Sequence, residues 1–290
     1  MCDQDHYEED MKLYMSSSYL TRRQFSALSF TASLTMLLPS PANAQAVTES
    51  DVDVKTPDGV ADSYFVHPSA GQHPGVIIWP DILGLRPAFR MMGKRLAESG
   101  YSVLVVNPFY RGKRAPVVKP GASFADPEVK QTVFPLAGQL NATTHVTDAR
   151  AFVAWLDTQK SVSRTRRMGT MGYCMGGPIV MRTAGASDRV GAGASFHGGG
   201  LVDPKAGDGS PHLVAAKTKA QFLIAIAEND DQRAPKEKDV LRETFGNRAE
   251  IEVYAGAAHG WCPPDSAVYN KDQAEKAWSR LLVLFGKALA

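Results

Sequence analysis

Short apolar runs that are rich in β-branched residues recur along most of the chain. Each run is continuous rather than alternating, which is typical of strands buried on both faces of a parallel sheet. The runs predict strands at residues 75–79, 102–107, 168–172, 190–196, 221–227 and 251–254. Residues 51–67 predict one or two antiparallel strands at the edge of the same sheet.

Helical spacing of apolar side chains is found between these runs. It predicts helices at residues 86–99, 143–158, 178–183, 235–245 and 271–289. Repeated alternation of strands and helices indicates an α/β fold, with one mostly parallel sheet covered by helices on both faces. Ligands bind at the carboxyl ends of the strands in such sheets, so the residues directly after each strand are the candidates for chemistry. Residues 115–142 have weak periodicity and are expected to form a lid or entrance segment.

The first 44 residues predict an export signal rather than part of the fold. Arg22 and Arg23 precede an uncharged apolar run at 25–38, and Ala42-Asn43-Ala44 fits the small-x-small pattern of a signal peptidase site. A twin-arginine pair in this place resembles a Tat signal, so the Tat export machinery is an expected transient partner. The expected product is a periplasmic or secreted domain of residues 45–290.

Two further properties of this N-terminal region affect the prediction. The apolar run is too short to cross about 30 Å of hydrocarbon, so we expect no stable membrane anchor. Residues 1–10 contain five acidic side chains, which signal sequences usually avoid. Met11 or Met15 would therefore be a more conventional start of translation.

Composition narrows the classes of function. The 290 residues include 32 Lys and Arg against 30 Asp and Glu, and 44% are hydrophobic. This balance excludes a disordered chain, and it gives no electrostatic reason to expect nucleic acid as a partner. The sequence has no metal-binding cluster, phosphate loop or haem motif, so no cofactor is expected.

The strongest catalytic motif surrounds Cys174. Gly172-Tyr173-Cys174-Met175-Gly176 follows a predicted strand and opens a predicted helix, which is the Gly-x-nucleophile-x-Gly form of a nucleophile elbow. The elbow requires small residues two positions before and after the nucleophile, and the helix N-terminus behind the thiol favours a thiolate. A dinucleotide-binding turn and a buried structural cysteine are the alternative interpretations.

An acid and a histidine follow in the order of an α/β-hydrolase triad. Asp230 and Asp231 come directly after the strand predicted at 221–227, and His259 follows the strand predicted at 251–254. Counting from the strand end favours Asp230 as the acid, whereas the spacing to Pro235 favours Asp231. His259 would take the thiol proton and later return it to the leaving group, while the carboxylate orients the imidazole.

Several longer motifs together are similar to those of one enzyme family. They read IIWPDILGLRP, NPFYRGKRAP, MGYCMGG, IAENDD and YAGAAHGW. The chain therefore resembles the dienelactone hydrolase (carboxymethylenebutenolidase) family of the α/β-hydrolase superfamily over about residues 50–290. The resemblance implies a single-domain α/β-hydrolase fold and a Cys174, His259 and Asp230 triad, with Asp231 as the alternative acid.

The same resemblance implies further roles in the site. Asp81 occupies the position of an acidic residue that contacts the resting thiol in the family, where Glu is more common. The backbone N–H groups of Ile82 and Met175 would form the oxyanion hole. The expected substrate-binding side chains are Tyr110, Arg111, His197 and Trp261.

Two departures bear on the substrate. A family arginine that binds a substrate carboxylate lies just after the catalytic histidine, but this chain has Trp261-Cys262-Pro263-Pro264 there. The run His197-Gly198-Gly199-Gly200 mimics the oxyanion motif of lipases, but it follows the nucleophile instead of preceding it and is expected to be a turn.

The expected function is hydrolysis of a small-molecule lactone or carboxylic ester through a thioacyl-enzyme intermediate. One alternative is a periplasmic thiol-redox or redox-switched protein that pairs Cys174 with Cys262. Another is a non-catalytic binding protein that keeps the elbow only as architecture.

Overall fold

The computed structural model describes residues 38–39, 41 and 44–290. Most of the predicted export segment, including Arg22 and Arg23, therefore lies outside the described residues. The strands are β1 (Val47–Thr56), β2 (Gly59–Pro68), β3 (Gly75–Trp79), β4 (Ser102–Val106), β5 (Met168–Tyr173), β6 (Val190–Phe196), β7 (Gln221–Ala227) and β8 (Ala249–Tyr254). The helices are α3 (Pro87–Glu98), α4 (Pro127–Ala137), α5 (Ala142–Asp157), α6 (Gly176–Ala186), α7 (Pro211–Ala216), α8 (Glu228–Arg233), α9 (Glu237–Phe245) and α10 (Lys271–Ala288), with short 3₁₀ turns η2 (Pro204–Gly209) and η3 (Gly246–Arg248).

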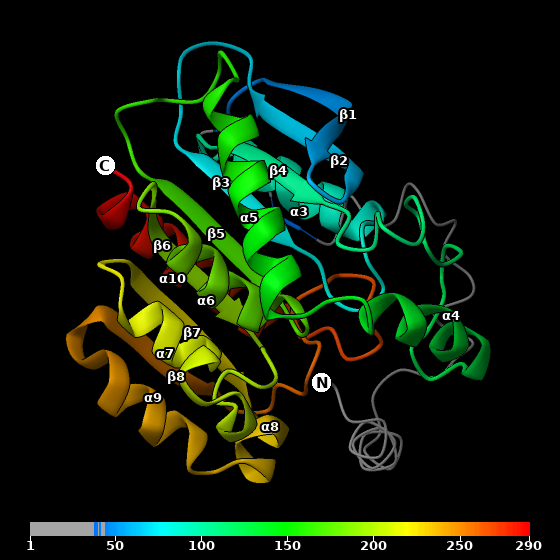
Figure 1. Cartoon of the computed structure of the whole chain (residues 1–290), viewed down its shortest axis with the longest axis vertical. Helices are drawn as coiled ribbons and strands as arrows, with labels where there is room; N and C mark the ends of the chain where they lie inside the picture. Colours follow the sequence, from blue (N-terminus) through cyan, green and yellow to red (C-terminus); the bar gives the residue numbers. More distant parts are fainter. Residues whose placement is uncertain (1–37, 40, 42–43) are drawn as a thin grey trace.

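All the strands named above join in one 8-stranded sheet with the order β1-β2-β4-β3-β5-β6-β7-β8 (Figure 1). β1 pairs antiparallel with β2, and β2 pairs antiparallel with β4, while the pairs from β4 through β8 are parallel. The predicted α/β-hydrolase fold is confirmed. Because the parallel strands end at the same edge, the turns after β3, β5, β6, β7 and β8 gather there.

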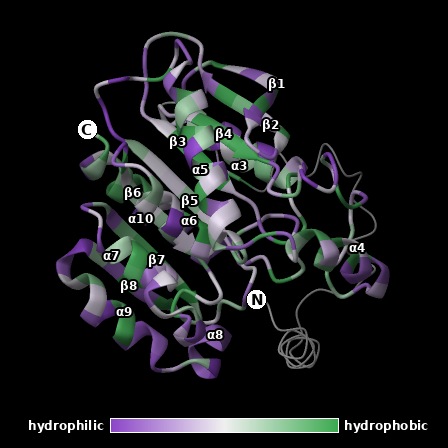
Figure 2. Cartoon of the chain, in the orientation of Figure 1, coloured by the Kyte–Doolittle hydropathy of each residue, from purple (hydrophilic) through white to green (hydrophobic). Residues whose placement is uncertain are grey.

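Helices cover both faces of the sheet and create two apolar layers. α3 and α10 pack on one face, where Phe89 and Phe285 lie in the core. α5, α6, α7 and α9 pack on the other face, where Phe152 lies in the core. Along β3, Ile77 faces the second layer while Ile78 faces the first, and both are fully buried. This double burial explains why the strands read as continuous apolar runs. Figure 2 shows mainly hydrophobic residues in the inner strands, whereas α8 and much of α9 are hydrophilic.

The segment after β7 differs from the expectation of a loop, because it forms the short helix α8. Glu228, Asp230 and Asp231 all lie in its first turn. Carboxylates there interact favourably with the exposed N–H groups and the positive end of the helix dipole. The helix predicted at 235–245 begins slightly later, at Glu237. Within the described ranges, no helix has the length and apolarity needed to cross a bilayer.

Candidate active site

Cys174 lies at a sharp turn between β5 and α6. Its φ angle of 51° falls in the left-handed region, and its side chain is buried. A non-glycine residue in this conformation costs about 1–3 kcal/mol and persists only where the surrounding structure enforces it. Such strain concentrates at functional sites. The turn places the thiol directly before the N-terminus of α6, as the elbow motif predicts.

Close backbone packing explains the glycines that flank Cys174. A Cβ atom on Gly172 would lie 2.4 Å from the carbonyl oxygen of Gly176. A Cβ atom on Gly176 would lie 2.5 Å from the carbonyl oxygen of Trp79, at the end of β3. Both distances are far below van der Waals contact, and the opposing atoms belong to the backbone. The Gly-x-Cys-x-Gly spacing is therefore what this turn requires.

His259 lies on the loop after β8 and is held by α8. Its Nδ1 is 2.7 Å from Oδ2 of Asp230, and its backbone N–H donates to Oδ1 of Asn229 at 2.8 Å. A carboxylate can only accept, so Nδ1 carries the proton and Nε2 of the neutral ring is left as the acceptor. Asp231 points elsewhere and binds Nζ of Lys238 at 2.6 Å. The structure thus pairs Asp230, rather than Asp231, with His259.

His197 contacts both Cys174 and His259. It follows β6, and its Nδ1 accepts the backbone N–H of Cys174 at 3.2 Å. Its ring centroid lies 5.0 Å from that of His259 in a T-shaped arrangement. The ends of β5, β6, β7 and β8 therefore bring Cys174, His197, Asp230 and His259 into one continuous cluster. Burial, followed by the nearby His259, lowers the pKa of His197 well below its usual value.

Asp81 belongs to an ion cluster in the turn after β3. Its carboxylate accepts from Nη1 and Nη2 of Arg86 at 2.6 and 2.9 Å, and Oδ1 also accepts the N–H of Leu83 at 2.9 Å. Arg86 donates as well to both oxygens of Asp265, at 2.7 and 3.0 Å. The cluster joins the turn after β3 to the loop that follows His259. Sequence reasoning missed Arg86 and Asp265, because a partner 179 positions away leaves no local pattern.

The two proposed oxyanion residues lie on adjacent strand ends. Trp79 of β3 pairs with Gly172 of β5, so the chain segments that lead to Ile82 and Met175 run side by side. Ile82 packs in an apolar cluster with Phe124 and Val133, and Met175 packs against a second cluster that includes Phe109, Val117 and Leu136. The predicted lid segment at 115–142, which contains α4, therefore covers both residues.

Tyr110 and Arg111, which the sequence suggested as substrate-binding residues, take part in an internal network. The Tyr110 hydroxyl donates to Asp148 at 2.7 Å and lies 2.7 Å from the hydroxyl of Thr56. Arg111 donates to both oxygens of Asp148, at 2.7 and 2.8 Å, and forms a further ion pair with Asp58. These contacts fasten the turn after β4 to α5 and to the β1–β2 hairpin.

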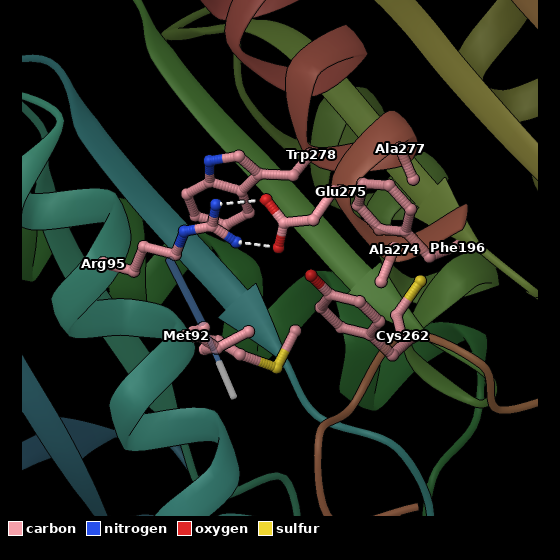
Figure 3. Close-up of a pocket in the computed structure, with 10 residues that line it drawn as sticks. Met92, Arg95, Phe196, Cys262, Ala274, Glu275, Ala277 and Trp278 are labelled. Atoms are coloured by element: carbon pink, nitrogen blue, oxygen red, sulfur yellow. Dashed lines mark hydrogen bonds and ion pairs between the residues drawn. The ribbon is translucent and has the colours of Figure 1, made fainter. Parts of the chain in front are cut away.

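Trp261 and Cys262 lie in the core on the side of α3 and α10. Trp261 is fully buried and stacks on Tyr254 with ring centroids 5.2 Å apart, and its edge contacts His197. Trp261 therefore packs against His197 from the core on the side of α3 and α10. Figure 3 shows Cys262 lining a small cavity between these helices, and the ion pair of Arg95 and Glu275 lines the same cavity.

Neither Cys174 nor Cys262 is in a disulfide. Burial raises the pKa of Cys262 well above its usual value, which disfavours the thiolate that thiol exchange requires. The redox interpretation thus receives no support from this geometry. Among the residues that the structure describes, no group of three or more His, Cys, Asp or Glu could hold a metal ion.

Comparisons with known proteins identify the family to which this chain belongs. The sequence model of the dienelactone hydrolase family matches residues 61–289. A Synechocystis sp. protein named "Putative carboxymethylenebutenolidase" is 28% identical over 228 residues, which cover 77% of this chain and 89% of that protein. The carboxymethylenebutenolidase of Rhodococcus opacus is 24% identical over 239 residues, covering 78% of this chain and 86% of that enzyme.

Solved structures show the same fold at lower identity. A crystal structure described as a "Putative Dienelactone Hydrolase" from Klebsiella pneumoniae superposes with a TM-score of 0.70 and 21% identity. The match covers 84% of this chain and the whole of that one. It establishes the α/β-hydrolase architecture for the described domain.

Proposed function

Because this chain belongs to the dienelactone hydrolase family and is thus a carboxylic ester hydrolase of the dienelactone hydrolase type, we propose that it cleaves a lactone or small ester through Cys174, His259 and Asp230. The main support for this triad is a series of three contacts. Asp230 binds His259, the ring of His259 contacts that of His197, and His197 accepts the backbone N–H of Cys174. The Nδ1–H of His259 donates to the carboxylate of Asp230, and Nε2 accepts the thiol proton.

The chemistry proceeds in two steps. His259 Nε2 takes the proton of Cys174, and Sγ attacks the carbonyl carbon while the N–H groups of Ile82 and Met175 stabilise the negative oxygen. The tetrahedral intermediate expels the alkoxide, which takes the proton from His259. In a lactone this alcohol stays attached to the acyl group. Water, deprotonated by His259, then attacks the thioester, releases the carboxylic acid and restores the thiol.

The arginines in the turns after β3 and β4 bear on the substrate. Arg111 is paired with Asp58 and Asp148, and Arg86 with Asp81 and Asp265. Each of these guanidinium groups is already neutralised by two carboxylates. We therefore propose an uncharged lactone or ester as the substrate, in place of one held through its own carboxylate.

A trapped thioester tests the function. We expect a rapid burst of p-nitrophenol on mixing with p-nitrophenyl acetate, and an acetyl group on the peptide that contains Cys174 after acid quench and mass spectrometry. Protein alkylated beforehand with iodoacetamide serves as the control and gives neither signal. A panel of neutral lactones, dienelactone and aryl esters then ranks substrates. Turnover with the acyl group on another residue would contradict the proposal.

We also propose that the protein is exported and processed before residue 45. The support is the sequence pattern around Arg22, Arg23 and Ala42-Asn43-Ala44. N-terminal sequencing of the protein recovered from the periplasm or the medium is expected to begin at Gln45. Replacement of both arginines by lysine is expected to prevent export through the Tat machinery. A mature form that retains Arg22 and Arg23 would refute the signal.

A further inference from the structure

His197 is a buried titratable residue that the proposed reaction does not use. It follows β6 with a φ angle of 41°, in the left-handed region, and its side chain is 1% exposed. Its backbone N–H donates to the carbonyl of Ala225 on β7 at 2.8 Å, which holds the residue at the end of the sheet. His197 and Cys174 are the non-glycine residues with positive φ in the described chain, and they contact each other.

One edge of the His197 ring contacts the nucleophile backbone. The N–H of Cys174 is shared between the carbonyl of Phe196 at 3.1 Å and Nδ1 of His197 at 3.2 Å. A backbone N–H can only donate, so Nδ1 carries no proton and the neutral ring bears its proton on Nε2. That Nε2 is buried and has no hydrogen-bond partner in the described structure.

The same ring also contacts the base. It meets His259 in a T-shaped contact at 5.0 Å and Trp261 at 5.1 Å, while Tyr173 lies 5.8 Å away. The titratable groups around His197 are thus Cys174, His259 and Tyr173. The hydrogen bond to Asp230 and the T-shaped contact with the His197 ring both hold the imidazole of His259.

We propose that His197 is a positioning residue, which fixes the backbone of Cys174 through Nδ1 and limits rotation of the His259 ring. This inference rests on the proposed function, in which Cys174 and His259 react together. The Nε2–H of His197 is buried without a hydrogen-bond partner in the described structure, and such a donor destabilises the fold. If the residue served only to fill space, an apolar side chain would therefore be more stable at this position. His197 has both this unpaired donor and a positive φ angle, and each of them costs stability. A role of the side chain in the site explains why a histidine is found there.

Two substitutions separate the two contacts. In His197→Asn, the side-chain oxygen can take the place of Nδ1, and Asn tolerates positive φ, but the ring contact to His259 is lost. In His197→Leu both contacts are lost, together with the unpaired donor. We expect kcat/KM to fall severalfold in the Asn variant and about 10- to 100-fold in the Leu variant, with the loss in kcat rather than KM. The urea midpoint of the Leu variant should not fall.

Alkylation of Cys174 by iodoacetamide provides a readout that needs no turnover. We expect the rate at neutral pH to fall in His197→Leu and to stay near the parent value in His197→Asn. His212→Leu, at a buried histidine on α7 bonded to Ser210, is the matched control and should leave both rates unchanged.

The outcomes are distinguishable. A His197→Leu variant that hydrolyses and alkylates like the parent overturns the positioning role, as does an equal loss in His212→Leu. A loss of activity that follows a fall in the urea midpoint would show a structural role instead. If ester hydrolysis proves independent of Cys174, the proposed function fails, while the alkylation rates still decide the inference about His197.

Discussion

The Cys174→Ala variant is expected to lose ester hydrolysis, with kcat/KM about 10⁴-fold or more below the parent. Alanine keeps the Cβ atom and can occupy the same turn, but it offers no nucleophile to the carbonyl carbon. The oxyanion hole and the binding site would leave only residual catalysis. Initial rates with an aryl ester and a neutral lactone, measured with reductant present, provide the test.

Two further variants make this test specific to the thiol. Cys174→Ser retains the shape of the elbow and a weaker nucleophile, so its rate should exceed that of the alanine variant. Cys262→Ala removes a thiol buried in the cavity that Trp278 also lines, and this variant should hydrolyse within threefold of the parent, a margin of about 0.6 kcal/mol. Equal activity in the parent and Cys174→Ala would exclude the elbow as the nucleophile. Loss of activity in Cys262→Ala would revive the redox interpretation.

The second large effect is expected at Asp230. Asp230→Asn should reduce kcat by about 10³- to 10⁴-fold, because an amide no longer selects the Nδ1–H tautomer of His259 or stabilises the imidazolium. Protein folding should persist, since Asn occupies nearly the same volume. Steady-state kinetics, with near-ultraviolet circular dichroism as a check of the fold, measure the effect.

Asp231→Asn is the matched control on the neighbouring residue. It removes the ion pair with Lys238 at the partly exposed surface, a kind of contact that contributes about 0–1 kcal/mol. We expect its kcat to stay close to that of the parent. A larger loss in Asp231→Asn than in Asp230→Asn would show that the other carboxylate orients the histidine in solution.

The sequence was sufficient for the framework of the fold. β3, β6 and β7 have the predicted bounds, because burial on both faces leaves an uninterrupted apolar signal that ends where the strand ends. The elbow motif could also be recognised from the sequence, because its requirement is local. Gly172 and Gly176 have backbone atoms where a Cβ would lie, so the local motif records a local steric requirement.

The short acidic helix α8 was not predicted, since six residues without an apolar stripe carry no periodic signal. This helix decides between Asp230 and Asp231. Successive side chains on a helix point about 100° apart, so one carboxylate reaches His259 while the other reaches Lys238. Residues that are adjacent in the chain and identical in type cannot be distinguished before that rotation is known.

The sequence by itself therefore determined the family, the mostly parallel sheet, and the order of the candidate residues Cys174, Asp230 and His259 along the chain. Only the tertiary structure decided which carboxylate binds His259, that Arg86 joins Asp81 to Asp265, and that His197 contacts both Cys174 and His259. The physical reason is the range of the interactions. Burial and backbone sterics act within a few residues and leave a local pattern, whereas these contacts depend on where separate strand ends meet in space.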